Sequence, residues 1–158
     1  MNKYWKQTTR KVYALLVNEV QVATLQFTKN SQAEIYTQGQ KYRLTRKKSW
    51  SRSFQVVNEK NHLIIEVTPR KWYSNDLLLR YQHQEYLLRH RNNPLHETVL
   101  QDLQKRDILA YGKGVENLKE RITVTDHRQG NDVNDHLLDT IVWFAFRSAP
   151  ELDLLDFI

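Results

Sequence analysis

The stretch that decides the fold is Asp135-His136-Leu137-Leu138-Asp139-Thr140-Ile141-Val142-Trp143-Phe144-Ala145-Phe146-Arg147. Acidic and amide residues precede it, as suits a helix N-terminus, and Pro150 is expected to end it, so we predict a central helix at about residues 132–148. Apolar residues occupy nearly every face of this helix: Leu137, Leu138, Ile141, Val142, Trp143, Phe144 and Phe146. A helix that is apolar all round must be enclosed. The unbroken run 141–146 is far shorter than the roughly 20 residues that a bilayer requires, so we expect protein to enclose it.

Composition limits the classes of protein that fit. The chain has 158 residues and no cysteine, which excludes disulfides, a thiolate nucleophile and Cys-ligated zinc. We predict one domain, residues 1–150, followed by an acidic and apolar tail, 151–158. The first residues lack the apolar segment of a signal peptide, so we expect a cytoplasmic protein, peripheral at the membrane if it binds lipid.

Charge is distributed unevenly along the chain. The net charge is +6, but residues 131–158 carry six acids and one base, which leaves +11 on the first 130 residues. A body this basic favours an anionic partner such as phospholipid, a phosphorylated metabolite or nucleic acid. The alternative is a solvated basic surface that only keeps the protein soluble.

Short apolar runs separated by turn residues fill the chain before the helix. We predict twelve strands, at about 3–8, 11–17, 20–27, 33–37, 41–46, 54–57, 63–67, 77–81, 86–90, 98–103, 108–111 and 122–125. A β-bulge near 23–24 would keep the third strand in phase, and 115–120 is expected to form one helical turn.

An enclosed helix favours a barrel over a sandwich, because a closed sheet has no exposed edges and an interior to fill. Alternation in one strand agrees: Tyr42 and Leu44 would face inward, and Lys41, Arg43 and Thr45 outward. The predicted fold class is therefore mostly β, an antiparallel closed barrel of about twelve strands around a hydrophobic C-terminal helix.

Two strand pairs and the helix resemble a known family. The pairs are AEIYT (33–37) with KYRLTRK (41–47), and FQVV (54–57) with LIIEV (63–67), and the helix is 137–146. Together they resemble the tubby C-terminal-like superfamily, and most closely the small bacterial members of its LURP-one-related group. The resemblance implies a barrel around a central helix, and a link to phospholipid, because tubby proteins bind phosphoinositides and scramblases act on phospholipids. The cysteine-rich features of scramblases are missing here.

Basic residues around the fifth predicted strand are the candidate binding site. The candidates are Lys41, Arg43, Arg46, Lys47, Lys48 and Arg52, with Arg70 and Lys71 expected nearby. Several cations at one strand end can coordinate a phosphate group, and Trp50 or Trp72 could sit at a membrane interface. The alternative is that these outward bases guard strand edges and aid solubility. Nucleic acid is not favoured, since no recognition motif is present.

Catalysis finds little support in the sequence. No nucleophile elbow, phosphate-binding loop, dinucleotide fingerprint or metalloprotease helix occurs, so we expect no enzyme, no cofactor and no metal. His136 and Asp139, with Asp132 and Asp135, could form an acid–base or metal cluster, but capping of the helix is the preferred interpretation. Asp139 falls inside the apolar helix, so it needs a buried partner such as Arg, Lys, Tyr or a backbone amide.

The C-terminal tail alternates acids with large apolar residues. We expect it to dock on the basic face of its own barrel or of a second subunit, or else to extend the helix packing or fray. Self-association would then use Leu152, Leu154, Leu155, Phe157 and Ile158. An interaction or scaffold protein without a small-molecule ligand is the alternative function.

Overall fold

The computed structural model describes residues 2–29, 32–46, 51–72 and 75–155, with side chains for all of these except 116, 131 and 149–155. Twelve strands precede one α-helix in this part of the chain. The strands are β1 (Lys3–Thr9), β2 (Val12–Val17), β3 (Val20–Phe27), β4 (Ala33–Thr37), β5 (Gln40–Thr45), β6 (Phe54–Asn58), β7 (Leu63–Pro69), β8 (Leu77–Tyr81), β9 (Gln84–His90), β10 (Thr98–Gln101), β11 (Asp107–Glu116) and β12 (Lys119–Asp126).

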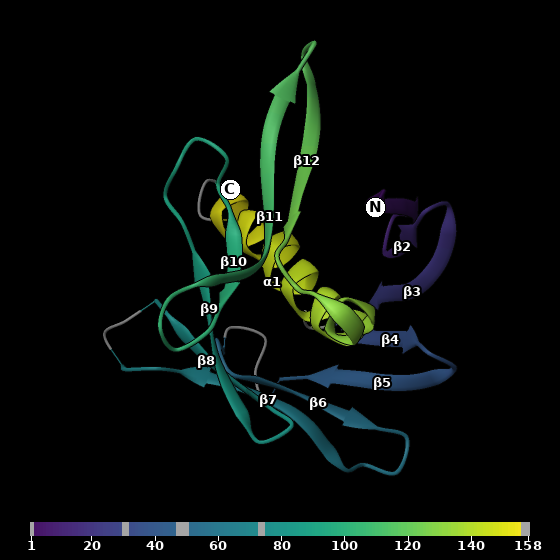
Figure 1. The fold of residues 1–158 in the computed structure, drawn as a ribbon, viewed down its shortest axis with the longest axis vertical. Coiled ribbons are helices and arrows are strands. Elements are labelled where there is room, and N and C mark those ends of the chain that lie inside the picture. Colours follow the sequence, from purple (N-terminus) through teal and green to yellow (C-terminus); the bar gives the residue numbers. More distant parts are fainter. Residues whose placement is uncertain (1, 30–31, 47–50, 73–74, 156–158) are drawn as a thin grey trace.

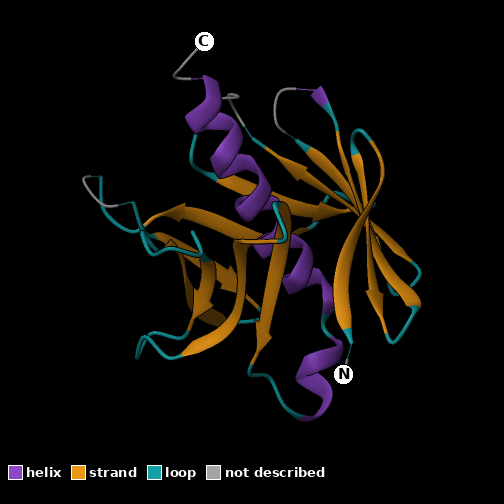
Figure 2. Cartoon of the chain, turned by 90° about the horizontal axis from the view of Figure 1, so that it is seen from above, coloured by secondary structure: helices purple, strands orange, loops and turns teal. Residues whose placement is uncertain are grey.

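All twelve strands form one antiparallel sheet in which each pairs with its sequence neighbours. The sheet curls into a nearly closed barrel around the helix α1 (His136–Leu155), as Figures 1 and 2 show. Among the described residues no backbone ladder joins β1 to β12. The predicted fold class is confirmed, with the refinement that this last seam is not closed by strand pairing.

Five of the connections between strands contain only two residues, and four of these share one backbone conformation. In each of the four both central residues have positive φ: Asn18 and Glu19, Gln38 and Gly39, Gln82 and His83, and Asn117 and Leu118. Left-handed backbone at both positions defines the type I′ turn, whose twist matches that of the flanking strands. These turns therefore fix the register of four hairpins without needing long loops.

The up-and-down order gives the barrel two distinct rims. We call the rim where α1 begins the lower rim and the one where α1 leaves the upper rim, following the view of Figure 2. Gln38 Nε2, in the β4–β5 turn, donates a 3.1 Å hydrogen bond to Asn134 O just before the helix, so this turn belongs to the lower rim. The connections then alternate: 18–19, 38–39, 59–62, 82–83, 102–106 and 127–135 lie at the lower rim, and 10–11, 28–32, 46–53, 70–76, 91–97 and 117–118 at the upper.

The central helix differs from its predicted bounds at both ends. A short 3-10 helix, Gly130–Asn134, precedes it, and α1 itself starts at His136. The prediction that Pro150 ends it was wrong, because α1 continues to Leu155. Proline has the φ of a helix, so it can stand within one, although it removes one backbone hydrogen bond and its ring crowds the carbonyl four residues earlier.

Trp143 lies at the centre of the core. Its indole ring stacks on that of Trp5 from β1, with centroids 5.0 Å apart and 8° between the planes. Tyr13 and Tyr111 meet it edge-on, with centroids at 5.4 and 5.6 Å. Such pairs add about 0.5–1.5 kcal/mol each to the burial of their area. The seven apolar side chains assigned to the core helix are all buried, which confirms that the barrel encloses them: Leu137, Leu138, Ile141, Val142, Trp143, Phe144 and Phe146.

Local details of the strands follow the sequence in part. Leu44 is buried and Tyr42 packs against the core, as alternation predicted. The bulge of β3 falls at Val22, one residue before its predicted place, because Leu15 pairs with Ala23 and Leu16 with Gln21.

The helical turn predicted at 115–120 was wrong. Residues 107–126 form one long hairpin instead, which projects beyond the rest of the sheet in Figure 1. Its strand β11 continues through Gly112, where a Cβ would lie 2.6 Å from Thr123 Oγ1. Glycine here permits close approach of the two strands, so it does not mark the end of one.

Candidate functional site

The basic residues singled out in the sequence separate into two groups. Lys41 and Arg43 lie on the outer wall of β5, as predicted, and both have partners there. The Lys41 ammonium is 3.7 Å from the Glu34 carboxylate, and Arg43 donates a hydrogen bond to the side chain of Asn61. These two bases therefore have local partners on the lower part of the wall, away from the upper rim.

The second group lies at the upper rim. Arg46 follows β5 directly, Arg52 precedes β6, and Arg70 and Lys71 follow β7; the last three have exposed side chains. Lys47 and Lys48 fall outside the described residues, as does Trp50. The structure thus brings the loops of Arg52 and Arg70 to one rim, although they are far apart in sequence.

The two rims differ in charge. Connections at the upper rim contain two acids and eight bases among their described residues: Arg10, Lys11, Lys29, Arg46, Arg52, Arg70, Lys71 and Arg91. Connections at the lower rim contain five acids and four bases. In an up-and-down sheet, every second connection lies at the same rim. Charges that are mixed along the sequence are therefore separated between the two rims. We call the eight upper-rim bases the upper basic surface.

Two arginines cover the aromatic core at the upper rim. The Arg46 guanidinium lies 5.1 Å from the ring centroid of Phe144 and 5.5 Å from that of Phe54. Burial lowers the pKa of Arg46, whose guanidinium also donates to Ser51 O at 2.5 Å. Arg147 lies over Trp143 at 5.5 Å and donates to Glu120 at 3.1 Å. Arg46 therefore has a packing role in addition to its charge.

Near the lower rim, a buried ionic cluster surrounds Asp139. This carboxylate is wholly inaccessible and receives Arg128 at 2.8 Å, Lys3 at 3.2 Å and the Tyr111 hydroxyl at 2.7 Å. His136 Nδ1 lies 3.4 Å away. The prediction that Asp139 needs a buried Arg, Lys or Tyr partner is confirmed.

A second carboxylate completes this cluster. Asp126, at the end of β12, lies 2.5 Å from Lys3 Nζ and 2.9 Å from Arg128 Nη2. Lys3 belongs to β1, so this ion pair joins the first strand to the last across the seam that lacks backbone pairing. Two cations and two carboxylates, all nearly inaccessible, close the barrel here.

The cluster holds its carboxylates ionised. Burial alone would raise the pKa of Asp139, but the hydrogen bond from His136 and the charges of Arg128 and Lys3 outweigh it and hold the pKa at about 2. Burial likewise opposes the ionisation of Asp126, and the bonds from Arg128 and Lys3 still lower its pKa. The pKa of Tyr111 is raised well above its usual value by burial and by Asp139. Tyr111 therefore stays a neutral donor.

This arrangement favours a structural role for the cluster. Each of its charged groups has at least one partner of opposite charge, as a buried charge requires. Asp135, which the sequence placed beside His136 and Asp139, instead accepts a 2.8 Å hydrogen bond from the Tyr81 hydroxyl. Within the described ranges, no three His, Asp or Glu side chains are grouped so as to hold a metal ion.

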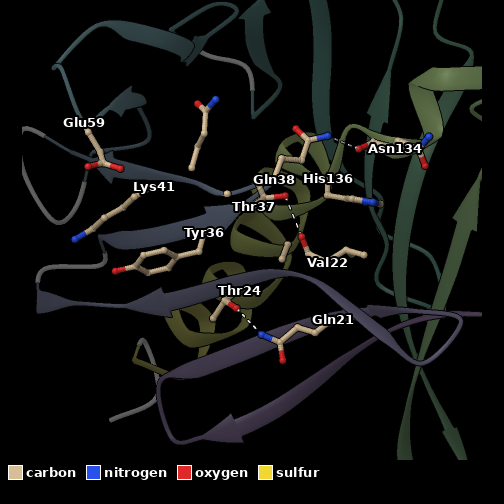
Figure 3. A pocket seen from close by; sticks show the side chains of 13 residues that line it. Gln21, Val22, Thr24, Tyr36, Thr37, Gln38, Lys41, Glu59, Asn134 and His136 are labelled. Atoms are coloured by element: carbon tan, nitrogen blue, oxygen red, sulfur yellow. Dashed lines mark hydrogen bonds between the residues drawn. The ribbon is translucent and has the colours of Figure 1, made fainter.

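A surface hollow of about 850 Å³ lies where β3, β4 and β5 approach the start of α1 (Figure 3). The outward side chains of Thr24, Tyr36 and Lys41 form one row across its floor. They lie side by side because Tyr36 pairs with Thr24 on β3 and with Lys41 on β5. Glu59 continues the row beyond β5, and His136 lies at the opposite side of the hollow.

Hydrogen bonds among its own lining residues fix the shape of this hollow. Thr37 Oγ1 donates to Val22 O at the bulge, and Gln21 Nε2 donates to Thr24 Oγ1, at 3.1 and 3.0 Å. Sequence reasoning missed the hollow. The available signal was Tyr36, a large aromatic residue at an outward position of its strand, where 43 % of it is exposed.

Comparison with known proteins adds no assignment. No protein-family model, no curated protein and no solved structure matches this chain. Among the described residues, no helix combines the length and the apolar character needed to cross a membrane.

Proposed function

We propose that this chain is a non-enzymatic binding module for anionic phospholipid headgroups, or another phosphorylated ligand, and that the upper basic surface is its binding site. The observation that carries the proposal is the segregation of charge between the described connections of the two rims, with eight bases and two acids at the upper rim and four bases and five acids at the lower. A one-sided field of this kind attracts polyanions and is weakened by salt.

Exposed aromatic surface beside these bases supports a lipid ligand. Trp72 follows Arg70 and Lys71 and is 89 % exposed. Tryptophan is favoured at the headgroup level of a membrane, and each nearby Lys or Arg adds about 1 kcal/mol of attraction to an anionic leaflet. The resemblance to the tubby-like superfamily agrees with this ligand class. We place such a protein in the cytoplasm, at the membrane surface.

The structure changes which bases the proposal uses. Lys41 and Arg43 were the first candidates, but they lie on the outer wall of β5, outside the connections that carry the excess of bases. We therefore assign headgroup binding to the upper basic surface and treat the wall pair as a comparison.

The test is cosedimentation with vesicles of phosphatidylcholine, with and without phosphatidylserine, over a salt series. Reversal of two upper-rim bases, Arg70→Glu with Lys71→Glu, should weaken binding to the anionic vesicles by at least about tenfold. The matched control is Lys60→Glu with Lys105→Glu, which makes the same charge change at the lower rim. Equal losses in both pairs would mean that binding follows net charge alone and would refute the site.

Two further experiments distinguish a lipid headgroup from a free phosphorylated ligand, and the upper rim from the wall of β5. Competition by soluble inositol phosphates, with no preference for vesicles, would indicate a free phosphorylated ligand. Lys41→Glu with Arg43→Glu tests the wall of β5 and should leave most of the binding intact.

A scaffold role is the second candidate function. It is favoured by the tip of the projecting β11–β12 hairpin, where Val115 is 78 % and Leu118 is 98 % exposed. Lys119 and Arg121 alternate there with Glu116 and Glu120, so the tip would receive the apolar residues of the tail, 151–158, of a second copy chiefly through Val115 and Leu118. Sedimentation velocity over a concentration series tests this. Self-association should be lost in Leu118→Ser and in a chain truncated after Pro150; a monomer at all concentrations refutes it.

A further inference from the structure

The hollow between β3, β4 and β5 differs chemically from both rims, because seven of its thirteen lining residues carry an amide or a hydroxyl side chain. Tyr36 lies on the outer face of β4, on the side of the hollow near Lys41 and Glu59, and is 43 % exposed. The Lys41 ammonium lies 5.6 Å from the centroid of the Tyr36 ring. An exposed ring held in place by a neighbour offers a flat, weakly polar surface on which a ring-shaped ligand can stack.

Three glutamines line the hollow, and each uses only part of its amide within the protein. Gln21 and Gln38 donate through Nε2, to Thr24 Oγ1 and Asn134 O, at 3.0 and 3.1 Å. Gln40 accepts through Oε1 from the Tyr42 hydroxyl at 3.1 Å, so its amide lies on the Tyr42 face of β5, away from Tyr36. The first two leave side-chain carbonyl oxygens as acceptors. Acceptors of this kind suit ligand hydroxyl groups, which can donate to them.

The charge of the hollow excludes the ligand class assigned to the upper rim. Lys41 is 3.7 Å from the Glu34 carboxylate, and Glu59 lines the same hollow. With its cation matched and a further acid present, the site offers no net attraction to phosphate. Its volume of about 850 Å³ falls in the range of sites for small molecules, about 300–1,000 Å³.

We propose that this hollow is a binding site for a neutral saccharide. A pyranose ring would stack on Tyr36, and its hydroxyl groups would donate to the side-chain carbonyl oxygens of Gln21 and Gln38. The bonds from Thr37 to Val22 O and from Gln38 to Asn134 O hold the wall in shape before the ligand arrives, which lowers the entropic cost of binding. This site is independent of the upper basic surface.

The test is saturation-transfer NMR of the full-length chain with uncharged sugars at millimolar concentration. The panel contains the methyl glycosides of glucose, galactose, mannose and N-acetylglucosamine, together with cellobiose, lactose and chitobiose. At least one sugar should bind and should perturb the backbone resonances of β3–β5 around Tyr36. Tyr36→Ala should weaken that binding by about tenfold or more, and Tyr36→Phe should preserve it, because the stacking surface remains.

Matched variants keep the result interpretable. Tyr4→Ala removes another outward tyrosine, one that donates to Glu19 on a different part of the wall, and should leave binding unchanged. Gln21→Leu keeps the size of its side chain and removes the amide, so it should weaken binding without changing thermal unfolding. Absence of binding to every sugar, equal losses in Tyr4→Ala and Tyr36→Ala, or perturbations at the upper rim would each overturn the proposal.

Discussion

The two rims of the barrel place the same kinds of charged residue in opposite surroundings. Near the lower rim, Lys3 and Arg128 are almost inaccessible and face two buried carboxylates. At the upper rim, Arg52, Arg70 and Lys71 are exposed, and bases outnumber acids eight to two in the described connections. The lower cluster closes the seam between β1 and β12, whereas Arg52, Arg70 and Lys71 lie exposed in the upper connections.

The contribution of a charged side chain to the free energy of unfolding therefore depends on its burial, because only a buried charge requires a partner. A buried charge that loses its partner keeps its full desolvation cost, while an exposed one returns to water. The same substitution should therefore have very different effects at the two rims. The following predictions use that contrast, from the largest effect to the smallest.

Arg128→Met should be the most destabilising change. It leaves Asp126 and Asp139 buried with Lys3 as their main cation, and the loss of one partner from a buried ion pair costs about 3–5 kcal/mol. Urea unfolding at neutral pH measures the cost. The control is Arg80→Met, because Arg80 pairs with Glu66 and Glu85 on the surface and should cost less than about 1 kcal/mol. Equal costs for the two arginines would contradict the structural role of the cluster.

Acidification should have the second largest effect on stability, through the carboxylates of the lower cluster. The pKa of Asp139 is held at about 2, below its ordinary value of 3.8, and that of Asp126 is lowered as well. Carboxyls with a depressed pKa stabilise the fold above their unfolded pKa, so this contribution is lost as the pH falls from about 4 to about 2. For Asp139 it amounts to about 2 kcal/mol. Unfolding free energies measured across this window should fall more steeply in the wild type than in Asp139→Asn, and parallel curves would exclude the assignment.

Most of the fold was predictable because its signals are local. Period-two alternation and turn residues located the strands, and an apolar helix near the end required an enclosure. The errors share a physical cause: Pro150 and Gly112 are breakers by local propensity, but the chain continues through both. Position 112 requires a glycine because Thr123 lies too close for a Cβ atom. Thr123 is on the paired strand, and the sequence around Gly112 does not show which strand pairs with it.

The candidate sites were less predictable because they depend on which segments meet. Asp139 was recognisable as a buried acid, but its partner Lys3 lies at the other end of the chain. The basic run was visible, yet its division between the wall of β5 and the upper rim follows from strand direction alone. Arg46 looked like one more ligand-binding base, and only its contact with Phe144 reveals its packing role.

Arg46→Met tests that role and compares directly with Arg128→Met. The methionine keeps an apolar side chain over Phe54 and Phe144 but removes the guanidinium, so the loss should be about 1 kcal/mol, the scale of a partly desolvated cation–π contact. Chemical denaturation of the two variants under the same conditions measures the difference. A cost for Arg46→Met as large as that for Arg128→Met would show that the upper rim also depends on a buried charge.

The smallest effect on stability should come from the double reversal Arg70→Glu with Lys71→Glu. Both side chains are exposed at the upper rim, and surface substitutions usually change the unfolding free energy by less than about 0.5 kcal/mol. The same variant is expected to lose most of its binding to anionic vesicles, since attraction to a charged surface depends on bases that remain accessible. At this rim the substitutions should therefore reduce vesicle binding while leaving the free energy of unfolding nearly unchanged. If the double reversal instead destabilises the fold by several kcal/mol, the upper bases are structural, as the lower ones are, and the contrast between the two rims fails.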